Sequence, residues 1–369
     1  MSRPDFIPPA RPVIGDDEIE AAVRVLRSGM VVQGPEVKGF EDEFGAFVDG
    51  RHCVAVNSGT SALQLALMAL GLKSGDEVIV PSFSFAASAN AVRLAGAEPV
   101  FADIEPDHFC LDPDAVAAAV GPRTAAIMPV HLYGHPADMT ALTAVAERHG
   151  LAVVEDAAQA HGATWDGRPV GAWGQAGCFS FYPTKNMHSL EGGMVTTADA
   201  DFARTVRLLR NQGMEQRYAN EVVGANMRLT DVAAAIGRAQ LTKLAGWNEQ
   251  RQANAATLSA GLKHVGVPPV APNATHVFHQ FTIRVRDGRR DAVQEGLTER
   301  GIGSAVYYPT PIHLLRPYLP GAHPANRDWN LPETMRAADE VLSLPVWPGL
   351  TDEQLGRIVD AVNELTEES

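Results

Sequence analysis

Residues 151–162 read LAVVEDAAQAHG, a short apolar run that ends in two carboxylates and continues into small residues. Apolar runs of this length between polar or turn residues are typical of buried strands. The segment therefore predicts a strand over 151–155 that carries Asp156 at its carboxyl end. In an open parallel sheet this is the edge at which ligands bind. Asp156 has two interpretations, a functional carboxylate at that edge or the cap of a following helix.

On both sides of this strand, short apolar runs alternate with helical patterns. This alternation predicts an α/β protein with a mostly parallel central sheet flanked by helices. The further strand-like runs are 52–56, 77–80, 98–101, 124–130, 177–182 and 192–197, and the helical patterns are 60–70, 84–95, 112–120, 137–149 and a long stretch from about 230.

The chain is long enough for two domains, which we place at 1–250 and 251–369. The larger domain begins with a helix over 16–27, in which Ile19, Val23 and Leu26 share one face and are predicted to dock it. The smaller domain is predicted to be a compact α+β unit. Its strand-like runs are 278–286 and 303–308, and its helical patterns are 289–300, 333–342 and 351–366.

Composition excludes several classes of protein. The formal net charge is −14, from 44 acidic and 30 basic side chains, and no run of Lys or Arg stands out, which argues against binding to nucleic acid. Cys53, Cys110 and Cys178 show no metal-ligand spacing, so we expect no metal site and a reducing, cytoplasmic location. No apolar run is long enough for a membrane span, and no GxGxxG motif follows the first strand.

Two segments supply an anion cradle and an unusual lysine. In NSGTSAL (57–63), Gly59 permits close backbone approach, and Thr60 and Ser61 offer hydroxyls where a helix begins; an ordinary helix cap is the alternative. In CFSFYPTKNMHSLEGG (178–193), Lys185 lies among apolar and aromatic residues. Burial lowers the pKa of a lysine and makes it a better nucleophile, whereas a lysine with its head in water is the alternative. Ser180 adds a hydroxyl for a phosphate.

Three further positions point to polar recognition. Gln159 follows Asp156 by three residues and can hydrogen-bond a phenolic oxygen. In VGANMRLTDVAAAIGRAQL (223–241), Asn226 and Arg228 precede a helical run, and a guanidinium suits a carboxylate or a diphosphate. A surface salt bridge is the alternative for Arg228, and a structural role is the alternative for His161.

The chain resembles the DegT/DnrJ/EryC1/StrS family of sugar aminotransferases from about residue 8 to 365. The resemblance rests on ten segments, which in chain order read NSGTSAL, PSFSFAASAN, VHLYGHPADM, EDAAQAHG, FSFYPTKN, EGGMV, LRNQG, GANMRLTDVAAAIGRAQL, YYPTPIH and LSLPVWP. It implies a type I pyridoxal-phosphate (PLP) aminotransferase fold and a homodimer whose two active sites lie at the subunit interface.

The resemblance also assigns roles to matching residues. Lys185 forms the Schiff base with PLP, and Asp156 pairs with the pyridine nitrogen. The remaining cofactor contacts are Gln159 at the ring hydroxyl, Phe85 stacked on the ring, Gly59, Thr60, Ser61 and Ser180 around the phosphate, and Asn226 reaching the phosphate from the partner subunit. The expected substrate contacts are His188, Arg228, Tyr308 and His313.

The implied reaction has two halves. An amino acid, usually glutamate in this family, leaves its amino group on the cofactor, and a nucleotide-linked keto sugar then accepts it, with Lys185 moving the proton in both halves. The chain departs from the family pattern at His188, Ser189 and Leu190, where the family usually reads Thr-Thr-Gly. We therefore expect His188 or the loop 214–222 to help select the sugar.

Four other functions compete with this one. Relatives that dehydrate sugars carry histidine in place of the lysine, so Lys185 argues against that branch. Other relatives aminate a cyclitol ketone or build an aminobenzoate starter unit, and the sequence does not exclude a cyclitol. A non-catalytic regulatory protein that kept the fold has no need of the lysine, the aspartate and the phosphate-binding positions.

Overall fold

The computed structural model describes residues 6–367, and its centre is a seven-stranded sheet. The strand order is β1-β9-β8-β5-β4-β2-β3. The strands are β1 (His52–Val56), β2 (Glu77–Pro81), β3 (Glu98–Ala102), β4 (Thr124–Ile127), β5 (Ala152–Asp156), β8 (Ala176–Ser180) and β9 (Gly193–Thr197). All neighbours pair in parallel except β9, which runs antiparallel to β1 and β8. The predicted mostly parallel sheet is confirmed.

Helices cover both faces of this sheet, which explains why its strands are apolar at successive positions. Val153 and Val154 of β5 belong to two different hydrophobic clusters, because adjacent residues of a strand point to opposite faces. The helices of this part are α2 (Pro35–Phe47), α3 (Gly59–Ala69), α4 (Ala87–Leu94), α5 (Pro113–Ala119), α6 (Met139–His149), α7 (Ala200–Arg210) and α8 (Asp231–Leu241).

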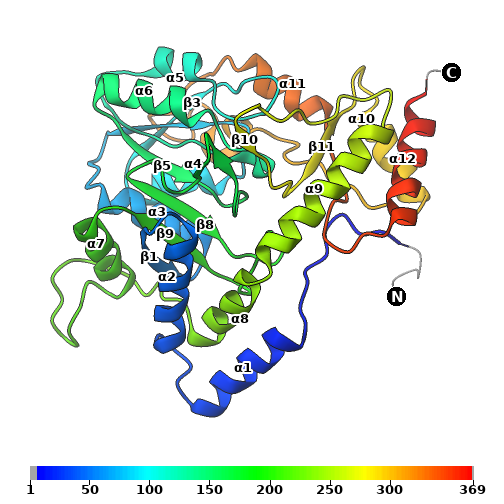
Figure 1. The fold of residues 1–369 in the computed structure, drawn as a ribbon. Coiled ribbons are helices and arrows are strands. Elements are labelled where there is room, and N and C mark those ends of the chain that lie inside the picture. Colours follow the sequence, from blue (N-terminus) through cyan, green and yellow to red (C-terminus); the bar gives the residue numbers. More distant parts are fainter. Residues whose placement is uncertain (1–5, 368–369) are drawn as a thin grey trace.

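A second body of structure forms around its own hydrophobic cluster, in which Leu258, Phe281, Leu342 and Ile358 are buried. The long helix α9 (Leu244–Gly261) runs from the large sheet to this cluster (Figure 1). The proposed boundary at 250/251 falls inside α9. The other elements are β11 (Phe281–Arg284), α10 (Arg290–Glu299), α11 (Pro332–Glu340), β12 (Val341–Leu344) and α12 (Asp352–Thr366), with β11 and β12 antiparallel.

Smaller elements complete residues 6–367. Three short strands form a separate small sheet in the order β10-β6-β7. They are β6 (Thr164–Trp165), β7 (Arg168–Pro169) and β10 (Ala274–Thr275), and the short 3-10 turns are η1 (Leu132–Gly134), η2 (Ile312–Leu314) and η3 (Arg316–Tyr318). Within this described part of the chain, no helix is both long and apolar enough to cross a membrane.

One predicted element of the smaller domain is wrong, and another is predicted two residues too long. Residues 303–308 form no strand of their own and contribute only an isolated bridge between Ala305 and Ser343. The predicted helix over 333–342 ends at Glu340, because Val341–Leu344 pairs with β11 as strand β12. In VLSL, packing of the apolar side chains against β11 outweighs continuation of the helix.

The predicted docking face of the first helix is not the face that packs within the single chain. Helix α1 (Asp16–Ser28) packs on α8, and its buried residues are Glu18 and Val25, whereas Ile19 is 54% exposed and Leu26 is 60% exposed. Glu18 accepts hydrogen bonds from Gln240 Nε2 at 2.9 Å and Lys243 Nζ at 2.8 Å. This polar docking turns the more apolar side of α1 outward.

Candidate active site

Lys185 lies in the segment that joins β8 to β9, at the carboxyl edge of the parallel strands. Its backbone N–H donates to Tyr182 O at 2.9 Å, and its side chain is half-buried. Within residues 6–367, its ammonium group forms no hydrogen bond. Burial lowers the pKa of Lys185 to about 8, and the charge of the Asp156 carboxylate opposes this shift.

Asp156 ends β5 and is 5% exposed. Its Oδ2 accepts a hydrogen bond from Ser88 Oγ at 2.8 Å, and its Oδ1 accepts one from the backbone N–H of Ala158 at 3.2 Å. Burial raises the pKa of Asp156, while these two hydrogen bonds and the nearby charge of Lys185 act to lower it. The structure thus brings Lys185 and Asp156 close enough for their charges to interact.

Gln159, Tyr308 and Phe85 form a linked group beside this pair. Gln159 Oε1 accepts from the backbone N–H of Tyr133 at 2.7 Å, and Gln159 Nε2 donates to the Tyr308 hydroxyl at 3.0 Å. The rings of Phe85 and Tyr308 are 5.9 Å apart, and Phe85 is 59% exposed. One N–H of the Gln159 amide remains for a ligand, since the other is directed at Tyr308.

The turn between β1 and α3 has the features of an anion site. Ser58 caps the helix by accepting from the backbone N–H of Ser61 at 3.1 Å, while the N–H groups of Gly59 and Thr60 form no hydrogen bond within the described chain. Such first-turn N–H groups attract anions. The hydroxyl of Ser61 lies 2.9 Å from that of Ser58.

Gly59 brings this turn against the end of β8. A Cβ atom at Gly59 would lie 2.7 Å from Ser180 Cβ and 3.1 Å from Ser180 Oγ, a separation that no larger residue tolerates without movement. Ser180 is 9% exposed. The predicted phosphate residues Gly59, Thr60, Ser61 and Ser180 therefore gather at one place.

Asn226 and Arg228 lie in a strand-like segment next to the same turn. The backbone N–H of Asn57 donates to Met227 O at 3.0 Å, and Arg228 forms a bridge with Val56. Arg228 Nη1 donates to Asn211 Oδ1 at 2.7 Å, and Asn226 is exposed. The backbone of this segment therefore lies beside the end of β1 that leads into the cradle.

The two predicted substrate histidines are buried, and their hydrogen bonds go to other residues. His188 is 2% exposed, and its backbone N–H donates to Gln240 Oε1 at 3.4 Å beneath α1. His313 is 6% exposed and its Nδ1 lies 2.7 Å from Ser82 Oγ. In the described part of the chain, neither histidine hydrogen-bonds Lys185 or Asp156.

The sequence reasoning missed Ser88, Ser84 and Tyr133. Ser88 and Ser84 lie within PSFSFAASAN, so the family resemblance covered them, but only the folded chain shows that Ser88 contacts Asp156. His161 is buried between Phe179 and Phe181, and burial lowers its pKa to about 3, which keeps it neutral. No group of side chains in residues 6–367 has the arrangement of a metal site.

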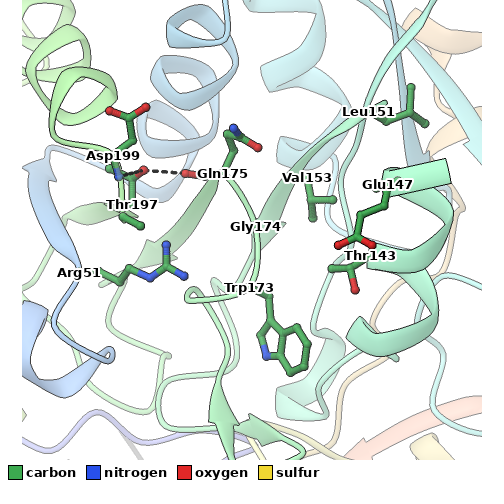
Figure 2. Close-up of a pocket in the computed structure, with 12 residues that line it drawn as sticks. Arg51, Thr143, Glu147, Leu151, Val153, Trp173, Gly174, Gln175, Thr197 and Asp199 are labelled. Atoms are coloured by element: carbon green, nitrogen blue, oxygen red, sulfur yellow. Dashed lines mark hydrogen bonds between the residues drawn. The ribbon is translucent and has the colours of Figure 1, made fainter. Parts of the chain in front are cut away.

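A separate surface pocket lies at the opposite edge of the sheet (Figure 2). It is lined by Arg51, Glu147, Trp173 and Asp199 among others, near the amino ends of β5 and β8. At one side of this pocket, Thr197 Oγ1 donates to Gln175 O at 2.7 Å and accepts from the backbone N–H of Asp199 at 3.2 Å, as the dashed lines in Figure 2 show. It contains none of the predicted site residues, and parallel sheets bind their ligands at the other edge.

The sequence pattern of the DegT/DnrJ/EryC1/StrS aminotransferase family matches residues 12–363. The chain belongs to this family. It is 48% identical over 355 residues to dTDP-3-amino-3,4,6-trideoxy-alpha-D-glucose transaminase of Streptomyces venezuelae, covering 95% of this chain and 92% of that one. The family resemblance seen in the sequence is confirmed.

Solved structures of DegT/DnrJ/EryC1/StrS proteins share the fold. S. venezuelae DesV in complex with a ketimine intermediate superposes with a TM-score of 0.91 at 47% identity over 95% of each chain. The putative sugar aminotransferase Spr1654 from Streptococcus pneumoniae, solved in a PMP-form, gives 0.93 at 27% identity over 98% of each chain. The expected type I aminotransferase fold is confirmed, and the family is one of PLP-dependent aminotransferases.

The residues of this DegT/DnrJ/EryC1/StrS chain fit PLP. The half-buried Lys185 amine has no hydrogen bond within residues 6–367, Asp156 is buried and close to it, and the turn at Gly59 offers free N–H groups beside Ser180. These groups match an aldehyde, a pyridine nitrogen and a phosphate, respectively.

Proposed function

We propose that this chain transfers an amino group from glutamate to the keto group of a nucleotide-linked deoxysugar, with PLP as cofactor. The proposal is carried by one observation, the half-buried amine of Lys185 next to the buried carboxylate of Asp156. A lysine with a pKa of about 8 is partly uncharged near neutral pH and is then able to attack a carbonyl carbon. A purely structural lysine has no need of this setting.

Five groups of the chain would hold the cofactor. Lys185 would bond to the aldehyde carbon, and the Asp156 carboxylate would keep a proton on the ring nitrogen. The free N–H of Gln159 Nε2 would donate to the ring hydroxyl, and Phe85 would cover one face of the ring. The N–H groups of Gly59 and Thr60, with the hydroxyls of Thr60, Ser61 and Ser180, would bind the phosphate.

When bound, PLP supplies an electron sink that stabilises negative charge on the carbon that loses a proton. The chain would supply the base: Lys185 would take the proton from the donor carbon and return it to the aldehyde-derived carbon on the other side of the nitrogen. In the second half-reaction the same amine would move the proton in the opposite direction. Asp156 supports both halves, since an ionised carboxylate at the ring nitrogen favours its protonated form.

For the keto sugar we propose contacts to Arg228, Tyr308 and His313. Arg228 lies beside the phosphate turn and is able to bind a nucleotide diphosphate by bidentate hydrogen bonds. His188 is buried, so we propose that it influences the sugar pocket through the following residues, Ser189 and Leu190.

We also propose a homodimer in which Asn226 reaches the partner's phosphate site. Large apolar side chains remain exposed on the single chain, which is typical of an interaction surface. They include Ile19, Leu26, Met30 and Val32 in and after α1, Phe85 and Tyr182 near the site, and Val223, which is 92% exposed. We propose a cytoplasmic location, supported by three buried cysteines that form no disulfide.

Borohydride trapping tests the proposed chemistry. Reduction of the PLP-loaded protein should fix the cofactor on Lys185, as peptide mass spectrometry would show, and glutamate added beforehand should prevent the labelling. Lys185→Ala should remove both the label and the visible absorbance of bound PLP, with Lys73→Ala, an exposed lysine, as the control. Labelling of another lysine, or turnover by Lys185→Ala, would refute the proposal.

A turnover panel tests the proposed substrate. Purified enzyme should aminate nucleotide-linked keto sugars with glutamate as donor and should leave keto-inositols unchanged. Faster turnover of a keto-inositol would replace the sugar with a cyclitol while leaving the cofactor chemistry in place.

A further inference from the structure

Two serine hydroxyls connect the segment after β2 to Asp156. Ser84 Oγ lies 2.9 Å from Ser88 Oγ, and Ser88 Oγ donates to Asp156 Oδ2 at 2.8 Å. Ser84 is 3% exposed and Ser88 is fully buried. A carboxylate only accepts hydrogen bonds, so the proton of Ser88 is directed at Asp156 and Ser88 must accept from Ser84. The donation therefore runs in one direction, from Ser84 through Ser88 to Asp156.

This arrangement holds the carboxylate at both of its oxygens. Ser88 donates to Oδ2, and the backbone N–H of Ala158 donates to Oδ1. Ser88 lies in the first turn of α4, whereas Ala158 follows β5, so two separate elements fix the plane of the carboxylate. A carboxylate held from two sides resists rotation away from a ring that binds to it.

The same hydroxyl also affects the charge of Asp156. Burial favours the neutral form of a carboxyl group, and hydrogen bonds donated to the carboxylate favour the charged form. Among the groups that favour the charged form, the Ser88 hydroxyl acts most strongly, followed by Ala158, Lys185 and His131. The charge of Asp156 in turn contributes to raising the pKa of Cys178 and of Tyr308, the other titratable groups that face it.

We propose that Ser88, supported by Ser84, is a positioning residue that keeps Asp156 ionised and oriented toward the ring nitrogen of the cofactor. This inference rests on the proposed function. It assigns a role to two residues that touch neither the cofactor nor the substrate in the scheme above. Their effect passes entirely through Asp156.

PLP binding to the apoprotein tests the proposal without relying on turnover. Ser88→Ala should raise the Kd for PLP at neutral pH by about tenfold, the usual loss when a hydrogen bond to a charged group is removed. The increase in Kd on acidification should also begin at higher pH than in the wild type, because Asp156 without its hydroxyl donor has a higher pKa. Ser84→Ala should shift both quantities in the same direction by less.

The double variant separates a relay from two independent packing defects. If Ser84 acts through Ser88, then Ser84→Ala should have no further effect on the Kd in a Ser88→Ala background. Ser343→Ala is the matched control, because it also removes a buried hydroxyl pair, the 2.8 Å contact of Thr282 and Ser343 in β11 and β12. It should leave the Kd and its pH dependence unchanged.

The binding measurements distinguish failure of the proposed function from failure of the positioning role. Wild-type protein that fails to bind PLP refutes the proposed function itself. Wild-type binding with an unchanged Kd and pH profile in Ser88→Ala refutes the positioning role alone, as does full additivity of the two serine variants. If Ser88→Ala does not fold, Ser84→Ala, which retains the bond between Ser88 and Asp156, decides the question by whether its acid profile shifts.

Discussion

At the residue scale, Lys185 differs from a solvent-exposed lysine in the environment of its amine. Its amine is half-buried and lacks a hydrogen bond in the described chain, so folding removes water from a cation without a close replacement. The environment that makes the charged amine unfavourable also makes the amine nucleophilic near neutral pH. The sequence identified Lys185 by type and motif, but its altered pKa depends on Asp156 and on the segments that cover it.

Lys185→Met should stabilise the apoprotein in a pH-dependent way. The unfolded chain keeps the lysine proton up to its ordinary pKa of 10.5, while the folded chain keeps it only up to about 8. The wild type is therefore penalised below pH 8, and the penalty fades as the pH rises from 8 to 10.5. We expect Lys185→Met to raise the free energy of unfolding by roughly 2 kcal/mol at pH 7, allowing for partial exposure.

Urea unfolding of the apoprotein at pH 7 and pH 10 measures this difference. The gain from Lys185→Met should shrink strongly between the two values, and Lys73→Met should show no such change. An equal gain at both pH values would mean that the charge of Lys185 does not cause the effect.

At the element scale, the site depends on where the first turn of α3 meets the end of β8. The helix cap at Ser58 could be predicted from NSGTSAL, since a serine before a helical run is a standard start signal. The contact with Ser180 could not, because more than a hundred residues separate the two segments. The same limit applies to α1, whose docking through Glu18 depends on Lys243 and Gln240.

Gly59→Ala should disrupt the phosphate site. The added Cβ would lie 2.7 Å from Ser180 Cβ, so α3 and β8 must separate. We expect the Kd for PLP to rise at least about tenfold, because misplaced donors lose their hydrogen bonds to the phosphate. Equilibrium titration with PLP measures this.

Gly246→Ala in α9 is the matched control, because a Cβ there meets no atom within 4 Å. It should leave the Kd unchanged and raise the free energy of unfolding by about 0.5–1 kcal/mol, the usual gain for Gly to Ala inside a helix. Equal Kd values for the two variants would show that the contact between Gly59 and Ser180 is unimportant.

At the scale of the whole molecule, the N-terminal segment contacts both domains. Ile7 is buried in the cluster that contains Leu258 and Phe281, and the chain then passes to α1 on α8 (Figure 1). Sequence reasoning placed the N-terminal segment wholly in the larger domain. The exposed apolar residues that remain on the single chain are the basis for the proposed dimer.

Mixing two impaired variants should restore activity if the subunits share their active sites. A hybrid of Lys185→Ala and Asn226→Ala subunits has one site with both defects and one site with neither. After exchange of equal amounts, we expect about a quarter of the wild-type activity, since half of the dimers are hybrids with one intact site. Asn226→Ala should be assayed at a PLP concentration where it is nearly inactive alone.

Steady-state turnover before and after subunit exchange measures the recovery. Lys185→Ala mixed with Asp156→Asn is the control, because both residues belong to the same subunit's site and no hybrid contains an intact one. No recovery in the test mixture would show that Asn226 serves its own subunit. Recovery in this control would mean that regained activity does not measure the sharing of sites.

The amino-acid sequence was enough to establish the α/β class, the order of strands and helices in the larger domain, and the family, because these follow from local periodicity and from motifs in a fixed order. The folded chain was needed to show which face of α1 docks, that Val341–Leu344 is a strand, and that Ser88 hydrogen-bonds Asp156. Each of these depends on a partner distant in the sequence. The local sequence pattern shows which side chains can pack or hydrogen-bond. Which partner each of them contacts is determined by packing and hydrogen bonding between segments that are distant in the sequence.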